Sequence, residues 1–123
     1  LVHIADVMHT GDQVPCIATT ASLSEALVEM TRKGLGMTAV VDGEGRLAGV
    51  FTDGDLRRAL DDAEVDLRGT PVTALMTPTA KTIGPDRLAV EAARLMETHK
   101  IHALLVVDAD RRVVGALNIH DLL

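Results

Sequence analysis

The ten residues GVFTDGDLRR, from Gly49 to Arg58, bring together side chains that could do chemistry. The hydroxyl of Thr52, two carboxylates and two consecutive guanidiniums follow an apolar run that ends in Phe51, the lone aromatic residue. Three interpretations fit this composition: a catalytic acid–base cluster, a cation site, or a cradle for a ligand that carries both hydroxyl and phosphate groups. The elements that position these residues must decide among the three.

The composition limits the classes of partner. With 123 residues, the chain forms one compact domain or two very small ones that share a core. Its formal net charge of −6 disfavours nucleic acid or an anionic membrane as the main partner. The lone Cys16 excludes an internal disulfide and fits a reducing compartment, so we expect a cytoplasmic protein. Because the chain starts without methionine and stops on an apolar residue, we expect a piece of a longer protein.

The sequence contains an internal repeat. A shift of 66 residues aligns residues 17–57 with residues 83–123 without a gap, and eleven of the forty-one pairs are identical. A short lead precedes each copy, IADVMHTGD and VTALMTPTA, and Met8 in the first lead corresponds to Met76 in the second. The repeat predicts two half-domains, residues 1–65 and 66–123, that bury one face against each other.

Each copy starts with the pattern of an amphipathic helix. Ser22 and Glu25 have the spacing of a capping box, apolar residues recur at helical intervals, and Gly34 follows as a stop. The corresponding helix of the second copy is predicted from about Arg87 to His99, with Asp86 as its cap.

The second half of each copy predicts a hairpin followed by a helix. Residues 37–42 and 46–52 are short β-branched runs around a glycine turn, and the pattern recurs at residues 103–108 and 112–118. A second helix is predicted from near Asp53 or Gly54 to about Leu60. With a short strand around Cys16–Ile17, one copy is β-α-β-β-α, and residues 61–71 form a polar link.

This doubled unit, with GVFTDGDL and GALNIHDL at matching points, resembles a tandem pair of cystathionine-β-synthase (CBS) domains over nearly the whole chain. The resemblance implies an α+β fold in which two pseudo-symmetric β-α-β-β-α repeats pack sheet to sheet. The segments VMHTGDQVP, EMTRKGLGMTAV and GVFTDGDLRRAL are similar, more narrowly, to the C-terminal CBS pair of arabinose-5-phosphate isomerases. Those enzymes supply the pathway to 3-deoxy-D-manno-octulosonate (Kdo), a part of lipopolysaccharide biosynthesis. In them an upstream sugar-isomerase domain carries the catalysis, so this chain is expected to be non-catalytic.

The local pattern at the opening stretch fits a cradle and a plain helix cap equally well. Thr52 is placed between strand and helix, where its hydroxyl can cap the helix or donate to a phosphate, and the helix N-terminus adds unpaired N–H groups. Asp55, one turn in, can accept two hydrogen bonds from a ribose-like diol. The alternative is that both residues only cap and charge the helix start. The resemblance implies ligand contact, with Asn118 and Asp121 as the matching pair of a weaker or differently selective second site.

Other residues would complete the pocket. The turn Gly34–Thr38 and its counterpart Lys100–Leu104 can let backbone approach a ligand, although such residues are more often only a helix stop and a strand start. Consecutive arginines cannot share one helix face, and solvent exposure of both is the commoner case. The resemblance to the isomerases implies an anionic ligand, so we expect one of the two near it. The family places the lead that contains His9 beside the cleft between the repeats. The candidate ligand-binding residues are Thr52, Asp55, Arg57, Arg58, Gly36, Met37, Thr38, Ile17, His9, Asn118, Asp121, His102 and Thr82.

Other motifs are set aside. The glycine patterns GLGMTA and GEGRLAG lack dinucleotide spacing, neither DGD nor DAD continues into a calcium loop, and the five histidines are scattered. We therefore predict no catalytic residue, no metal and no cofactor beyond a regulatory nucleotide or CMP-sugar.

The leading hypothesis is a regulatory module that binds a nucleotide or nucleotide-sugar and biases its own sugar-isomerase domain. CMP-Kdo is favoured, because an activated end product is a logical feedback ligand. We expect a homodimer through the CBS pairs and a tetramer in the full-length parent. One alternative is an adenine-nucleotide sensor of another parent. The other is a ligand-free assembly module that associates through apolar helix residues, namely Leu23, Leu27, Met30, Leu95 and Met96.

Overall fold

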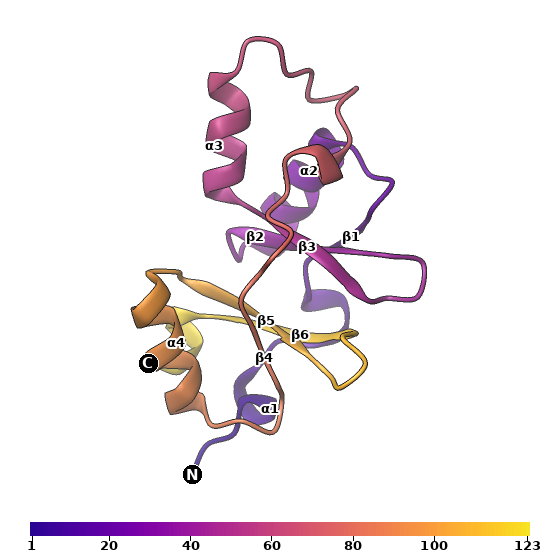
Figure 1. The fold of residues 1–123 in the computed structure, drawn as a ribbon. Coiled ribbons are helices and arrows are strands. Elements are labelled where there is room, and N and C mark those ends of the chain that lie inside the picture. Colours follow the sequence, from indigo (N-terminus) through magenta and orange to yellow (C-terminus); the bar gives the residue numbers. More distant parts are fainter. The chain divides into compact units, whose positions relative to one another are not determined.

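The computed structural model describes all 123 residues, which form two compact units (Figure 1). Unit 2 is the continuous segment Pro15–Ala80, whereas unit 1 combines Leu1–Val14 with Lys81–Leu123. Each unit has one three-stranded sheet and its own helices. The predicted α+β class is confirmed.

The sheet of unit 2 consists of β1 (Cys16–Ala18), β2 (Met37–Val41) and β3 (Leu47–Thr52), in that order. Strands β1 and β2 are parallel and are connected through α2 (Leu23–Lys33), while β2 and β3 form the predicted antiparallel hairpin. Helix α3 (Asp53–Asp61) begins directly after β3, and a 3₁₀ turn, η2 (Val72–Ala74), follows the polar link.

The predicted signals at both ends of α2 are confirmed. Ser22 is the N-cap, and its hydroxyl accepts the N–H of Glu25 at 3.2 Å. Gly34 ends the helix with φ of 70°, a left-handed conformation that costs glycine little.

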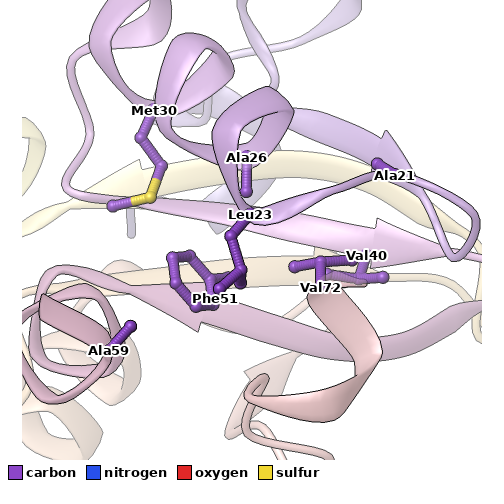
Figure 2. Close-up of a cluster of buried hydrophobic side chains, with 8 residues drawn as sticks. All are labelled: Ala21, Leu23, Ala26, Met30, Val40, Phe51, Ala59 and Val72. Carbon is purple, nitrogen blue, oxygen red and sulfur yellow. The ribbon is translucent and has the colours of Figure 1, made fainter. Parts of the chain in front are cut away.

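The core of unit 2 lies between the two helices and one face of the sheet (Figure 1). Figure 2 shows how Leu23 and Met30 of α2 point toward the sheet, where Phe51 of β3 is completely buried. The apolar stripe of α2 therefore belongs to the interior of its own unit. The buried cluster consists of Ala21, Leu23, Ala26, Met30, Val40, Phe51, Ala59 and Val72.

Unit 1 repeats this topology, with sheet order β4-β5-β6. Its hairpin has the same register as that of unit 2, including an irregularity between Val106 and Val107 that matches the one between Val40 and Val41. No helix in either unit has the length and apolar character that crossing a bilayer requires. The elements of unit 1 are α1 (Ile4–Val7), η1 (Gly11–Gln13), β4 (Thr82–Ile83), α4 (Ala89–His99), β5 (Ala103–Val107), β6 (Val113–Asn118) and η3 (Ile119–Leu122).

Two sequence predictions for unit 1 were wrong. Helix α4 begins at Ala89 with Leu88 as its N-cap, so Asp86 lies too early to cap it. The register of the repeat places Glu91 where Glu25 stands in α2. Its carboxylate accepts the N–H of Leu88 at 3.2 Å, although the N-cap Leu88 has no polar side chain to complete a capping box. The last helical element of the repeat also differs from the prediction: it is the short 3₁₀ helix η3, whereas its counterpart α3 in unit 2 is an α-helix.

Candidate ligand-binding site

The helix start of unit 2 is built by a capping box. Thr52 is both the last residue of β3 and the N-cap of α3. Its hydroxyl accepts the N–H of Asp55 at 3.2 Å, and the carboxylate of Asp55 accepts the N–H of Thr52 at 3.0 Å. Local folding of the sequence T-x-x-D therefore fixes both candidate residues at the junction of strand and helix.

The carboxylate of Asp55 is surrounded by donors. Its side chain is only 3% exposed, and the guanidinium of Arg58, one turn further along α3, contacts it. The hydroxyl of Thr77 lies 3.2 Å from each carboxylate oxygen, and that of Thr52 lies 3.1 Å from one of them. In this arrangement Asp55 stabilises the helix start, and a diol would have to replace one of these side-chain donors.

The same helix start offers positive groups to an anion. The guanidinium of Arg58 folds back toward Gly54, so a Cβ atom at Gly54 would lie 3.7 Å from Arg58 Nη1. The first turn of α3 carries the partial positive charge of a helix N-terminus. The N–H of Asp53 already donates to the carbonyl of Gly36, and that of Asp55 to the hydroxyl of Thr52. Of the two candidate arginines, Arg58 is thus the one beside this helix start, while Arg57 is exposed on the adjacent side of α3.

The loop before β2 borders this helix start. The carbonyl of Gly36 accepts the N–H of Asp53 at 3.1 Å, and Met37 is the partner of Thr52 in the hairpin register. Gly36 has φ of 75°, and a Cβ atom there would lie 3.1 Å from a carboxylate oxygen of Asp53. Gly36 is therefore needed both for the turn and for the close approach of the helix start.

Two candidates of unit 2 lie elsewhere. Thr38 is directly opposite Phe51 in the register, so its side chain lies on the core face of the sheet, where its hydroxyl donates to the carbonyl of Ala39 at 3.1 Å. Ile17 is on β1 at the opposite edge of the sheet from β3 and lines a separate hollow of about 340 Å³ beside α2. The structure thus gathers Thr52, Asp55, Arg58, Gly36 and Met37, and places Thr38 and Ile17 apart from them.

Unit 1 has a corresponding helix start with different donors. Asn118 caps η3 through its side-chain oxygen, which accepts the N–H of His120 at 2.9 Å, and its own N–H donates to Asp121 at 2.7 Å. The imidazole Nε2 of His9 lies 3.0 Å and 3.1 Å from the two oxygens of Asp121. The side chain of Asp121 is 20% exposed, so this carboxylate is more accessible than that of Asp55.

The remaining candidates of unit 1 take matching positions. His102 is exposed, and its carbonyl accepts the N–H of Ile119 at 2.8 Å, just as Gly36 accepts from Asp53. Thr82 pairs with Leu105 on the edge strand β4, away from β6.

Thr77 is a site residue that the sequence analysis missed. It follows Met76 as His9 follows Met8, so the correspondence of the two leads contained the signal. Each of the two residues is joined to the last strand of a sheet by a pair of backbone hydrogen bonds, His9 to Ala116 at 2.8 and 3.1 Å and Thr77 to Val50 at 2.8 and 2.9 Å. Both leads therefore run beside a helix start, one in each unit.

The fold is that of CBS domains. The CBS domain family matches residues 4–62 and 72–123, so the chain belongs to this family and carries two CBS domains, which form a regulatory, non-catalytic module. The chain is 56% identical over its full length to arabinose 5-phosphate isomerase KdsD from Pseudomonas aeruginosa, and 46% identical to KdsD from Escherichia coli K12. It spans 37% of the length of each of these relatives and corresponds to their CBS part.

A solved structure extends the comparison. The structure of CBSX2 in complex with AMP superposes with a TM-score of 0.86 at 27% sequence identity, covering 99% of this chain and 93% of that one. The predicted CBS pair is confirmed, and so is the similarity to arabinose-5-phosphate isomerases.

Proposed function

We propose that this CBS pair is the regulatory part of an arabinose-5-phosphate isomerase-like protein and that it binds a nucleotide or nucleotide-sugar at its helix starts. Ligand occupancy would then bias the activity of an attached sugar-isomerase domain in the cytoplasm. For that regulation to work, the ligand must prefer one arrangement of the module over another, since equal affinity for both shifts nothing. The parent is expected to assemble as a tetramer, with dimers formed through the CBS pairs.

The observation that carries the proposal is the group of donors and acceptors at the start of α3. Asp55 accepts hydrogen bonds from hydroxyl, N–H and guanidinium groups, which is an environment for a hydroxyl-bearing ligand rather than for a cation. Arg58 and the positive end of α3 beside Gly54 offer positive charge to a phosphate. A diol and a phosphate held a few ångströms apart are the recognition elements of a nucleotide.

Two ligand classes compete for this site. The KdsD relatives favour CMP-Kdo, because the activated end product of the Kdo pathway is suited to feedback on an early isomerase. The AMP complex of CBSX2 favours an adenine nucleotide. Both ligands carry a ribose diol and a phosphate; they differ in the base and in the Kdo sugar that CMP-Kdo adds, so the proposed contacts of Asp55 and Arg58 are common to the two.

A ligand-free assembly module is the second candidate function. Val28 on α2, Leu60 on α3 and Val90 on α4 are 57%, 62% and 56% exposed, so these helices retain apolar surface. The residues first considered for association are less suited to it, because Leu23, Met30 and Met96 are at most 4% exposed and lie in the cores of their own units.

A thermal-shift panel tests these proposals directly. The 123-residue chain is heated with CMP-Kdo, CMP, AMP, ADP, ATP or arabinose 5-phosphate. A ligand at about 100 times its dissociation constant adds roughly 2.7 kcal/mol to the free energy of unfolding, which raises Tm by several degrees in a domain of this size. A cytidine-selective shift supports the feedback sensor, an adenine-selective shift supports the adenine sensor, and no shift with any compound favours assembly.

Paired variants localise the binding. In the double variant Thr52→Ala/Asp55→Ala, we expect the ligand-induced shift to fall if unit 2 binds the ligand. In the matched variant Asn118→Ala/Asp121→Ala, the ligand-induced shift should fall if unit 1 binds the ligand. Each removes a cap worth about 1 kcal/mol, so the shift is compared with the Tm of the same variant without ligand. A shift that survives when all four residues are replaced together would contradict binding at the helix starts.

A further inference from the structure

In both units, a residue from outside the helix start reaches its carboxylate. Thr77 contacts Asp55 in unit 2, and His9 contacts Asp121 in unit 1. We call residues 1–14 the N-terminal strap and residues 72–80 the linker strap. The two straps occupy equivalent places, since each forms an isolated bridge with the last strand of its sheet, at Ala116 and at Val50.

The N-terminal strap is held to unit 1 along its length. Ile4 is completely buried among α4 and the sheet, and Met8 packs over Gly115, where even a Cβ atom would lie 2.4 Å from the methionine sulfur. Beyond the backbone bridge to Ala116, the imidazole of His9 is the strap side chain that reaches the helix start. The other ring nitrogen, Nδ1, lies 3.1 Å from the side-chain oxygen of Gln13, further along the same strap.

The two carboxylates differ in what a ligand would have to displace. Asp55 contacts three side-chain donors, namely Thr52, Thr77 and Arg58, so it keeps two of them when one leaves. Asp121 accepts the N–H of Asn118, which belongs to the helix start itself, and its side-chain donor is His9. An ionised carboxylate only accepts hydrogen bonds, so Nε2 of His9 must be the donor, and it faces both oxygens.

We propose that His9 competes with the ligand for the carboxylate of Asp121, so that occupancy of the unit 1 site releases the N-terminal strap at this contact. The inference rests on the proposed nucleotide binding and adds its effect on the N-terminal strap. A diol that takes both oxygens of Asp121 removes the hydrogen bonds of His9, and the end of the strap from His9 to Val14 loses its side-chain anchor. His9 is thus a positioning residue that couples the site to the strap.

Because of thermodynamic linkage, the coupling can be measured either as a change in strap docking or as a change in ligand affinity. If the ligand weakens strap docking, then weakening the docking must strengthen ligand binding by the same factor. The sign is opposite to the usual result, in which removal of a polar side chain from a site lowers affinity. A ligand that merely bound beside an unchanged His9 would protect the strap.

The experiment uses the full 123-residue chain with AMP and CMP as probes. Binding is measured by calorimetry, and exchange of the Met8 and His9 amides is followed by NMR with and without saturating nucleotide. In His9→Ala we expect affinity to rise about fivefold and strap exchange to be fast already without nucleotide. In the wild type, nucleotide should accelerate that exchange several-fold.

Three variants make the outcomes distinct. Thr77→Ala, the matched change in unit 2, should leave the N-terminal strap unaffected, and Asp121→Asn should abolish the effect of nucleotide on the strap. His9→Thr, which copies the residue of the linker strap, should give intermediate affinity if the strap remains folded.

Nucleotide binding that is unchanged or weaker in His9→Ala, or that slows strap exchange in the wild type, overturns the coupling and leaves the proposed function standing. Absence of binding of AMP, CMP and also CMP-Kdo, tested in the same way, to every form overturns both.

Discussion

The carboxylate of Glu29 is a residue-scale anchor between α2 and the edge strand β1. Its side chain is 12% exposed, accepts the N–H of Cys16 at 2.9 Å and pairs with Lys33 at 3.0 Å. Burial by itself would raise its pKa, but the hydrogen bond from Cys16 and the charges of Lys33 and Arg32 outweigh burial and hold the pKa below the ordinary value of 4.5.

This lowered pKa gives a pH dependence with a definite sign. Because the folded state favours ionised Glu29, its contribution to stability is complete above pH 4.5 and is lost as the pH falls through the lower pKa of the folded state. We expect the wild type to lose more unfolding free energy than Glu29→Gln between neutral and acidic pH, as measured by urea titrations at several pH values. Parallel pH profiles for the two proteins would show that Glu29 contributes nothing.

The thiol of Cys16 gives a second residue-scale prediction. Burial and the neighbouring charge of Glu29 raise its pKa, although Lys33 opposes them. Since the thiolate is the nucleophile, we expect slow alkylation by iodoacetamide near neutral pH despite the exposure of the residue. Glu29→Gln should accelerate alkylation of the folded chain, while the two proteins should react equally in denaturant. Equal rates in the folded state would remove Glu29 as the cause.

At the scale of elements, glycines let the straps approach the sheets. A Cβ atom at Gly49 of β3 would lie 2.7 Å from the sulfur of Met76 and 2.8 Å from the carbonyl oxygen of Thr77. A Cβ atom at Gly115 of β6 would lie 2.4 Å from the sulfur of Met8, which can move, and 3.1 Å from the carbonyl oxygen of His9. The backbone contact is therefore tighter in unit 2.

We predict that Gly49→Ala destabilises the chain by about 1–3 kcal/mol, as expected for overpacking, and that Gly115→Ala costs less. Urea denaturation measures both. Gly43→Ala, in the hairpin turn with nothing within 4 Å of its Cβ position, is the matched control and should change stability little. If Gly49→Ala lowered the free energy of unfolding no more than Gly43→Ala, the linker strap would be able to move away from β3 without destabilising the chain.

The elements themselves were largely predictable because their signals are local. The capping box at Ser22, the glycine stop at Gly34 and the T-x-x-D sequence at Thr52 each act within four residues. Asp86 was misassigned as a cap because a polar residue near a helix start looks like one, whereas Glu91 alone supplies the cap of α4. The repeat register would have identified Leu88 as the N-cap.

The site was only partly predictable because half of its contacts are distant in sequence. The pair Thr52 and Asp55 follows from spacing, but the contact of Thr77 with Asp55 spans 22 residues, and that of His9 with Asp121 spans 112. The register of the hairpin also determines which face of the sheet each side chain lies on. Thr38 pairs with Phe51 and lies on the core face, while Met37 pairs with Thr52. Spacing within a motif cannot supply either kind of information.

At the scale of the whole molecule, unit 2 is inserted in sequence between the two segments that form unit 1. Unit 1 therefore depends on two segments separated by the whole of unit 2, and α1 is the part of the first segment that enters the core. Ile4 is completely buried beside Ala92, Met96 and Leu104. The stability of unit 1 should consequently respond to a change at the very beginning of the chain.

We predict that Ile4→Ala lowers the stability of unit 1 by about 2–5 kcal/mol, the usual range for such a truncation in a core, and that unit 2 is affected less. Native-state hydrogen exchange separates the units, with the amide of Val106 in β5 reporting on unit 1 and that of Val40 in β2 on unit 2. Val2→Ala, at a side chain that is 53% exposed, is the control and should stay within about 0.5 kcal/mol. Equal losses at both reporters would mean that the two units unfold together.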